Sequence, residues 1–185
     1  MSDAEVADPD DATVMGVSIP VPAPFGEDLQ QRRASFGDPL AHAIPTHVTL
    51  LGPTPVTSDD LPALVEHLDT AAATTDPFTM VLRGTGTFRP VSDVVFVQVA
   101  QGISACEQLE RSIRCGRWSR NLAFPYHPHV TVAHDVDEDG LDLAFDDLAD
   151  YAAAFEVGSF QLYEQDEAGT WTPVREFALG EEPAR

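Results

Sequence analysis

Two short segments of this chain have the same form, since residues 47–49 and 129–131 both read His-Val-Thr within short apolar runs. In an extended strand successive side chains point to opposite faces, so each histidine shares a face with the threonine two residues later. Imidazole has an unperturbed pKa of about 6.5 and can serve as a general base or a general acid near neutral pH. A fold that joins the two polar faces would therefore place two imidazoles and two hydroxyls around one reacting group.

The sequence around the two segments supports this interpretation. Pro45 lies two residues before His47, and Pro128 lies directly before His129. Proline is tolerated where a strand begins, because its missing N–H is not needed there. The alternative is that both histidines are ordinary strand residues and that the threonines are present for their β propensity.

At these residues the sequence resembles the 2H phosphoesterase superfamily, which includes the so-called 2′-5′ RNA ligases and related cyclic nucleotide phosphodiesterases. That family carries two His-x-[Ser/Thr]-x motifs with an apolar x, about half of a bilobal domain apart. Residues 47–50 and 129–132 match the motif, and the resemblance extends over about residues 14–179. It implies a metal-independent phosphodiesterase that needs no cofactor. The catalytic residues that it implies are His47, Thr49, His129 and Thr131.

The motifs lead to a mechanism for a 2′,3′-cyclic phosphate or a similar strained diester. One histidine would deprotonate water, and the other would protonate the leaving sugar oxygen, so a bell-shaped pH dependence is expected. Thr49 and Thr131 would hydrogen-bond the non-bridging oxygens and stabilise the charge that develops in the transition state. Either histidine could be the base.

Three further residues are candidates for substrate binding: Arg120, Phe88 and Tyr126. Arg120 ends a series of arginines spaced three residues apart from Arg111, which could line a phosphate path or simply complement a helix C-terminus. Phe88 and Tyr126 lie where a base could stack, although aromatic residues at strand starts often belong to the core.

A metal site is the weaker interpretation of the remaining histidines. His127, His129 and His134 supply imidazoles, but the first two are separated by a proline and would need a third ligand in place. We therefore expect no bound metal. Cys106 and Cys115 lack CxxC spacing and are expected to be reduced structural thiols.

Composition restricts the class of partner. The chain has 185 residues, 43% of them hydrophobic, and a formal net charge of −21. Such acidity argues against a protein that binds duplex DNA, because counterion release needs a basic face, whereas a small nucleotide or a short RNA end is easier to accept. An acid-rich proteome explains the bulk charge most simply. We expect a monomer.

No segment has the composition of a membrane span or a signal peptide, so we expect a cytoplasmic protein without membrane contact. The expected organisation is an acidic disordered tail over residues 1–12, a single domain over 13–180 and a short C-terminal tail over 181–185. The 13–180 domain is long enough to bury a substantial core.

Hydrophobic periodicity predicts alternating strands and helices along this domain. Strands are expected near residues 15–21, 47–51, 78–83, 94–99, 129–133, 155–163 and 171–179. Helices are expected near 27–33, 104–114 and 141–151, and from an N-cap at Ser58 to about residue 73. Because the order of elements is similar around each histidine, the predicted fold class is α+β and bilobal. Each of two related lobes would have an antiparallel or mixed sheet with outer helices, and the active cleft would lie between the lobes.

Two other functions are consistent with the same residues. A nucleotide-binding or RNA-end-binding protein could keep the two-histidine cleft with little turnover. An interaction module could instead use the acidic tail and the acidic stretch 135–150 to bind a basic partner.

Overall fold

The computed structural model describes residues 12–180, so nearly all of the expected N-terminal tail and the C-terminal tail lie outside the described residues. Within this range the elements follow one another from β1 to β8. The strands are β1 (Ala12–Pro20), β2 (His47–Thr57), β3 (Phe78–Thr87), β4 (Val94–Gln101), β5 (His129–His134), β6 (Ala152–Val157), β7 (Ser159–Gln165) and β8 (Trp171–Ala178). The helices are α1 (Phe25–Ser35), α2 (Leu61–Ala73), α3 (Ile103–Ile113), the short 3₁₀ helix η2 (Gly116–Trp118) and α4 (Glu138–Asp147).

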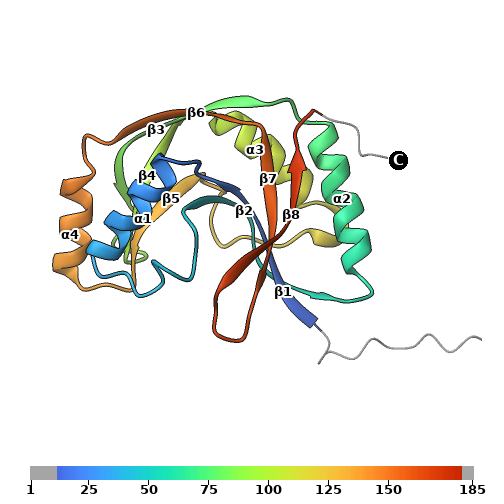
Figure 1. The fold of residues 1–185 in the computed structure, drawn as a ribbon, viewed down its shortest axis with the longest axis horizontal. Helices are drawn as coiled ribbons and strands as arrows, with labels where there is room; N and C mark the ends of the chain where they lie inside the picture. Colours follow the sequence, from blue (N-terminus) through green and yellow to red (C-terminus); the bar gives the residue numbers. More distant parts are fainter. Residues whose placement is uncertain (1–11, 181–185) are drawn as a thin grey trace, which may run out of the picture.

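The described strands form one antiparallel sheet in the order β6-β3-β4-β5-β2-β1-β7-β8. The sheet is strongly curved, with α1 and α4 at one end and α2 and α3 at the other (Figure 1). The predicted α+β class is confirmed. Two four-stranded halves meet where β5 lies beside β2, so the strands that carry the two histidines are central neighbours.

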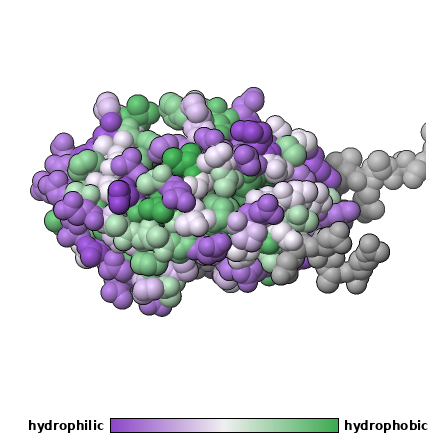
Figure 2. All heavy atoms as spheres, turned by 90° about the horizontal axis from the view of Figure 1, so that it is seen from above, coloured by the Kyte–Doolittle hydropathy of each residue, from purple (hydrophilic) through white to green (hydrophobic). Residues whose placement is uncertain are grey.

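The core lies on the face of these central strands that points away from the histidines. Val48 and Val130 are fully buried, and they share one apolar cluster with Leu64 of α2 and Leu109 of α3. Alternation along a strand then turns the side chains on either side of each valine to the opposite face. In the view of Figure 2, hydrophobic side chains gather towards the middle of the molecule, and hydrophilic ones prevail around its edge.

One predicted strand is in fact two. The expected strand over residues 155–163 is interrupted at Gly158, between β6 and β7. β6 pairs with β3 in one half of the sheet, whereas β7 pairs with β1 and β8 in the other. Gly158 and the shift of the apolar alternation from Phe155 and Val157 to Phe160 and Leu162 mark the break in the sequence. The choice of pairing partner is decided by residues that are distant in sequence.

Two helix boundaries also differ from the prediction. The residue at the N-terminal cap of α2 is Asp60 rather than Ser58. α4 begins at Glu138, earlier than expected, because the Asp137 side chain accepts a hydrogen bond from the backbone N–H of Gly140. That bond satisfies a helix N–H that would otherwise lack a partner. Both cysteines are free; Cys106 is buried and Cys115 is exposed.

Within residues 12–180, no helix is both long enough and apolar enough to cross a membrane.

Candidate active site

The two histidine segments meet at a single residue pair between β2 and β5. Val48 lies opposite Val130 in antiparallel register. Directly opposed residues share a face, so both valines enter the core, and the same register sets His47 beside Thr131 and Thr49 beside His129 on the other face. The structure therefore brings together the four residues that the motifs identify. All four side chains are partly exposed on this face.

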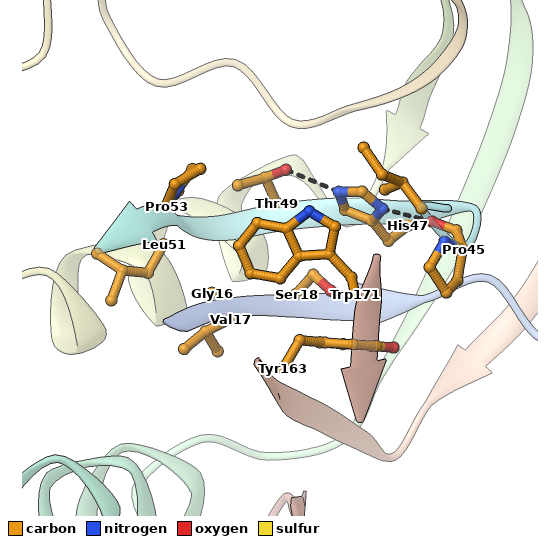
Figure 3. A pocket seen from close by; sticks show the side chains of 12 residues that line it. Gly16, Val17, Ser18, Pro45, His47, Thr49, Leu51, Pro53, Tyr163 and Trp171 are labelled. Carbon is orange, nitrogen blue, oxygen red and sulfur yellow. Dashed lines mark hydrogen bonds between the residues drawn. The ribbon is translucent and has the colours of Figure 1, made fainter. Parts of the chain in front are cut away.

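The two imidazoles are held by equivalent backbone contacts. His47 Nδ1 is 2.5 Å from the carbonyl oxygen of Pro45, and His129 Nδ1 is 2.7 Å from that of His127. Because a carbonyl oxygen only accepts hydrogen bonds, each Nδ1 carries the proton and each Nε2 is left for chemistry. His47 Nε2 lies 3.1 Å from Thr49 Oγ1. Figure 3 shows this contact as a dashed line.

The surroundings of both histidines disfavour the imidazolium form. Burial lowers the pKa of His47 below its ordinary value, the positive charges of Arg33 and His129 lower it further, and the Pro45 carbonyl opposes them. Burial likewise lowers the pKa of His129, and His127 acts in the same direction. Both imidazoles are therefore neutral near pH 7 in the free protein.

His129 is enclosed by an aromatic group that includes one predicted binding residue. The Phe88 ring lies edge-on to the imidazole of His129, with 5.0 Å between the ring centroids, and the Phe96 ring lies 5.1 Å away. Phe88 and Phe96 also contact each other. Phe88 is partly exposed, so it forms a side wall next to the second histidine.

The other two predicted binding residues occupy different positions. Tyr126 donates its hydroxyl to the backbone oxygen of Thr49 at 2.9 Å, and its ring packs against the core, so it connects the segment before β5 to β2. Arg120 is exposed, and its guanidinium donates to the carbonyl oxygen of Pro53 at 3.1 Å. Within the arginine series, Arg114 pairs with Glu110 and Arg117 with Asp60. These two arginines are therefore engaged in ion pairs with carboxylates of the protein itself.

A cavity of about 160 Å³ adjoins the first histidine. Its lining comes from β1, β2, β7, β8 and the segment before His47; it consists of Gly16, Val17, Ser18, Ile44, Pro45, His47, Thr49, Leu51, Gly52, Pro53, Tyr163 and Trp171. Trp171 and Tyr163 lie on the same side of the sheet as His47 and Thr49 (Figure 3). Both aromatic residues come from strands far along the chain, so no local pattern around the two motifs points to them.

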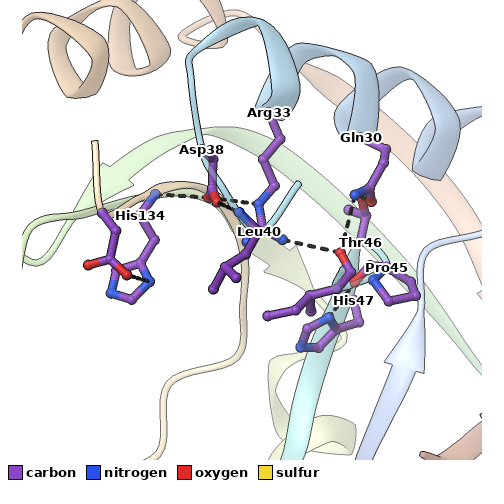
Figure 4. Close-up of polar contacts among 10 residues, drawn as sticks. Gln30, Arg33, Asp38, Leu40, Pro45, Thr46, His47 and His134 are labelled. Carbon is purple, nitrogen blue, oxygen red and sulfur yellow. Dashed lines mark hydrogen bonds and ion pairs between the residues drawn. The ribbon is translucent and has the colours of Figure 1, made fainter. Parts of the chain in front are cut away.

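A buried ion pair supports both histidine strands. Arg33 Nε donates to Asp38 Oδ2 at 2.8 Å, and both side chains are almost fully buried. Asp38 also accepts the backbone N–H of His134, at the end of β5. Arg33 in turn donates to the carbonyl oxygen of Ile44, just before β2 (Figure 4). One pair of side chains thereby connects the end of β5 to the start of β2.

Within the described part of the chain, no cluster of three or more histidine, cysteine, aspartate and glutamate side chains is placed to hold a metal ion. His127 and His129 lie with their rings stacked at 6.1 Å between centroids. His134 instead faces Asp135 at 3.5 Å.

Sequence comparison relates the chain to a described family. A model of the 2′-5′ RNA ligase superfamily matches residues 20–169. A protein of Halalkalibacterium halodurans named "Putative phosphoesterase" is 30% identical over 165 residues, which cover 84% of this chain and 92% of the relative. A protein of the same name from Oceanobacillus iheyensis is 30% identical over 150 residues, covering 77% of this chain and 85% of the relative.

Solved structures share the fold. E. coli LigT in complex with 3′-AMP superposes with a TM-score of 0.70 at 22% identity, covering 92% of this chain and 99% of LigT. TT0787 of Thermus thermophilus superposes with a TM-score of 0.58 at 22% identity, covering 91% of this chain and 99% of TT0787.

Proposed function

This chain belongs to the 2′-5′ RNA ligase superfamily, among the 2H phosphoesterases, and from this we propose that it is a metal-independent phosphodiesterase. Its substrates are 2′,3′-cyclic phosphates or related phosphodiesters of nucleotides and RNA ends. E. coli LigT has been crystallised with 3′-AMP, with NADP+ and with ATP, which supports a nucleotide as the ligand class. We also propose that the protein acts as a cytoplasmic monomer without a cofactor.

The observation that carries the proposal is the matched anchoring of the two imidazoles. Each Nδ1–H is engaged by a carbonyl oxygen two residues upstream, which leaves both Nε2 atoms without a proton on the same face of neighbouring strands, His47 Nε2 beside the Thr49 hydroxyl. One Nε2 takes a proton from water as water attacks phosphorus. The other Nε2 gives its proton to the sugar oxygen as the P–O bond breaks. Thr49 and Thr131 hydrogen-bond the non-bridging oxygens.

The lowered pKa values of His47 and His129 fit a reaction on an anion. A bound phosphodiester places negative charge beside both imidazoles and raises the pKa of each. Once one imidazole is protonated, its positive charge lowers the pKa of the other. Substrate binding therefore creates one acid and leaves one base.

The test is hydrolysis of the four 2′,3′-cyclic nucleotides in the presence of EDTA. We expect turnover by the wild type, and a fall of at least about 100-fold in kcat for both His47→Asn and His129→Asn, because each removes one proton transfer. His67→Gln is the matched control, since His67 contacts the Ile113 carbonyl oxygen, away from the two motifs, and this variant should retain activity.

Three other outcomes of this experiment would contradict the proposal or part of it. If the folded wild type binds 3′-AMP but forms no product from any of the four nucleotides, the chain is a nucleotide-binding protein rather than an enzyme for these substrates. Activity that survives both histidine substitutions would remove the proposed site, and loss of activity in EDTA that added metal restores would contradict the metal-independent mechanism.

A further inference from the structure

The cavity beside His47 has no role in the mechanism above. We propose that this cavity is the subsite for the base of the nucleotide whose phosphate is cleaved, and that Trp171 holds the base by stacking without selecting among the four bases. This inference rests on the proposed function. It adds a substrate requirement, because cyclic phosphates without a base should be poor substrates.

The position of the cavity connects it to the reacting group. His47 and Thr49 both line the cavity, and the same two residues are proposed to contact the phosphate. A substrate with its phosphate at the two histidines can therefore extend into the cavity without crossing the sheet. The volume of about 160 Å³ suits a group of one or two rings rather than a second nucleotide.

Two contacts hold Trp171 in place, one made by its backbone and one by its ring. Its backbone N–H donates to the carbonyl oxygen of Ala43 at 2.9 Å, which connects the start of β8 to the segment before His47. Its ring lies against Gly16 of β1, where an added Cβ would come within 2.8 Å of Trp171 Cζ3. Glycine at position 16 therefore lets the indole lie close to the strand, and the indole remains partly exposed.

The polar groups of the cavity are mostly engaged with one another. The Tyr163 hydroxyl donates to Gln161 Oε1 at 2.7 Å and also contacts the Ser18 hydroxyl. Both residues are buried, at 6% and 7% exposure for Tyr163 and Ser18. Few donors and acceptors are thus left to read the edge of a base. Stacking depends on a flat π surface, which all four bases have, so the cavity should accept purines and pyrimidines alike.

The test compares substrates with and without a base. The probes are the four 2′,3′-cyclic nucleotides and the 2′,3′-cyclic phosphate of 1-O-methylribose, which keeps the sugar and the strained ring. For Trp171→Ala we expect kcat/KM to fall by about 10- to 100-fold for all four nucleotides, as loss of one stacking contact predicts. For the methylribose substrate we expect a change of less than about twofold. Trp171→Phe should restore most of the loss.

Val174→Ala, an exposed position on the same strand, is the matched control and should leave both substrate types unaffected. Equal loss for the nucleotides and for methylribose cyclic phosphate in Trp171→Ala would show a merely structural role and overturn the proposal. So would a nucleotide-specific loss in Phe88→Ala alone, because that result places the base beside His129. Wild-type turnover of methylribose cyclic phosphate as fast as the nucleotides would also overturn it while leaving the phosphodiesterase intact.

Binding of the base in the cavity can be measured by fluorescence in the absence of turnover. In Trp118→Phe, Trp171 is the only tryptophan left. Titration with 3′-AMP should then quench the fluorescence of Trp171, whereas 1-O-methylribose 3-phosphate at the same concentration should not. If no cyclic phosphate is hydrolysed, the proposed function fails, and this titration still decides the subsite. An unchanged emission at saturating 3′-AMP would remove the subsite.

Discussion

The two histidines make equivalent backbone contacts but differ in what lies beside the imidazole. His47 Nε2 lies next to the Thr49 hydroxyl, whereas the ring of His129 lies against Phe88 and Phe96. An adjacent hydroxyl can accept a hydrogen bond from the imidazolium or donate one to the neutral ring. An aromatic wall only excludes water. The two residues that we propose as general acid and general base therefore have equivalent backbone contacts in unequal surroundings.

The lowered pKa values predict the pH dependence. An imidazolium whose pKa is lowered gives up its proton at a lower pH, so loss of the general acid sets in below the ordinary value of about 6.5. We expect kcat/KM, which reports the free enzyme, to decline as pH rises through a pKa below that value. The profile of kcat reports the complex and should lie at higher pH, because bound phosphate raises the histidine pKa.

The measurement is hydrolysis of 2′,3′-cyclic AMP over about pH 4.5 to 9, at low and at saturating substrate. Circular dichroism at each pH separates titration of the site from unfolding. A kcat/KM profile whose alkaline limb lies at or above the limb of kcat would contradict the electrostatic account.

At the scale of elements, the geometry of the site depends on the buried pair of Arg33 and Asp38. It connects the loop after α1 to the end of β5 and, through the Ile44 carbonyl oxygen, to the segment before β2. Breaking a buried pair leaves an uncompensated charge in the interior, which costs about 3–5 kcal/mol. We therefore expect Asp38→Ala to lower the free energy of unfolding by that amount.

Urea unfolding followed by circular dichroism measures this change. Asp147→Ala is the control, because Asp147 forms an exposed ion pair with Arg32 and its loss should change stability by less than about 1 kcal/mol. Equal effects of the two substitutions would show that the Arg33–Asp38 pair does not hold these elements together.

At the scale of the whole molecule, the net charge of the protein has the same sign as the charge of its proposed substrate. The net charge of −21 opposes the approach of a phosphodiester anion, and dissolved salt screens that repulsion. We expect kcat/KM for a cyclic mononucleotide to rise several-fold between about 0.01 and 0.15 M salt. Because repulsion acts on encounter rather than on the bound state, kcat should change little.

Initial rates at both salt concentrations test this expectation, with sodium chloride and potassium acetate compared to separate screening from specific ion effects. A steady fall of kcat/KM with salt would instead indicate a basic surface that attracts the substrate, of the kind expected for a protein that binds long nucleic acids.

Local patterns in the sequence predicted much of this molecule. The strands of the two motifs begin at His47 and His129, as the apolar alternation and the neighbouring prolines indicate. The α+β class followed from the order of periodic segments. Each of these features depends on residues within one element, so a linear reading can identify it.

Contacts between distant elements decided the rest. The strand parity within each motif showed which side chains share a face, but only the pairing of Val48 with Val130 set those faces side by side. The pairing that sends β6 and β7 to opposite halves of the sheet cannot be predicted from the residues around Gly158. The same holds for the placement of Trp171 on Gly16, at the far end of the chain. The sequence alone therefore determined which residues of each motif share a face of their strand. The tertiary structure decided what lies beside them, because strand pairing and packing join residues that no local periodicity relates.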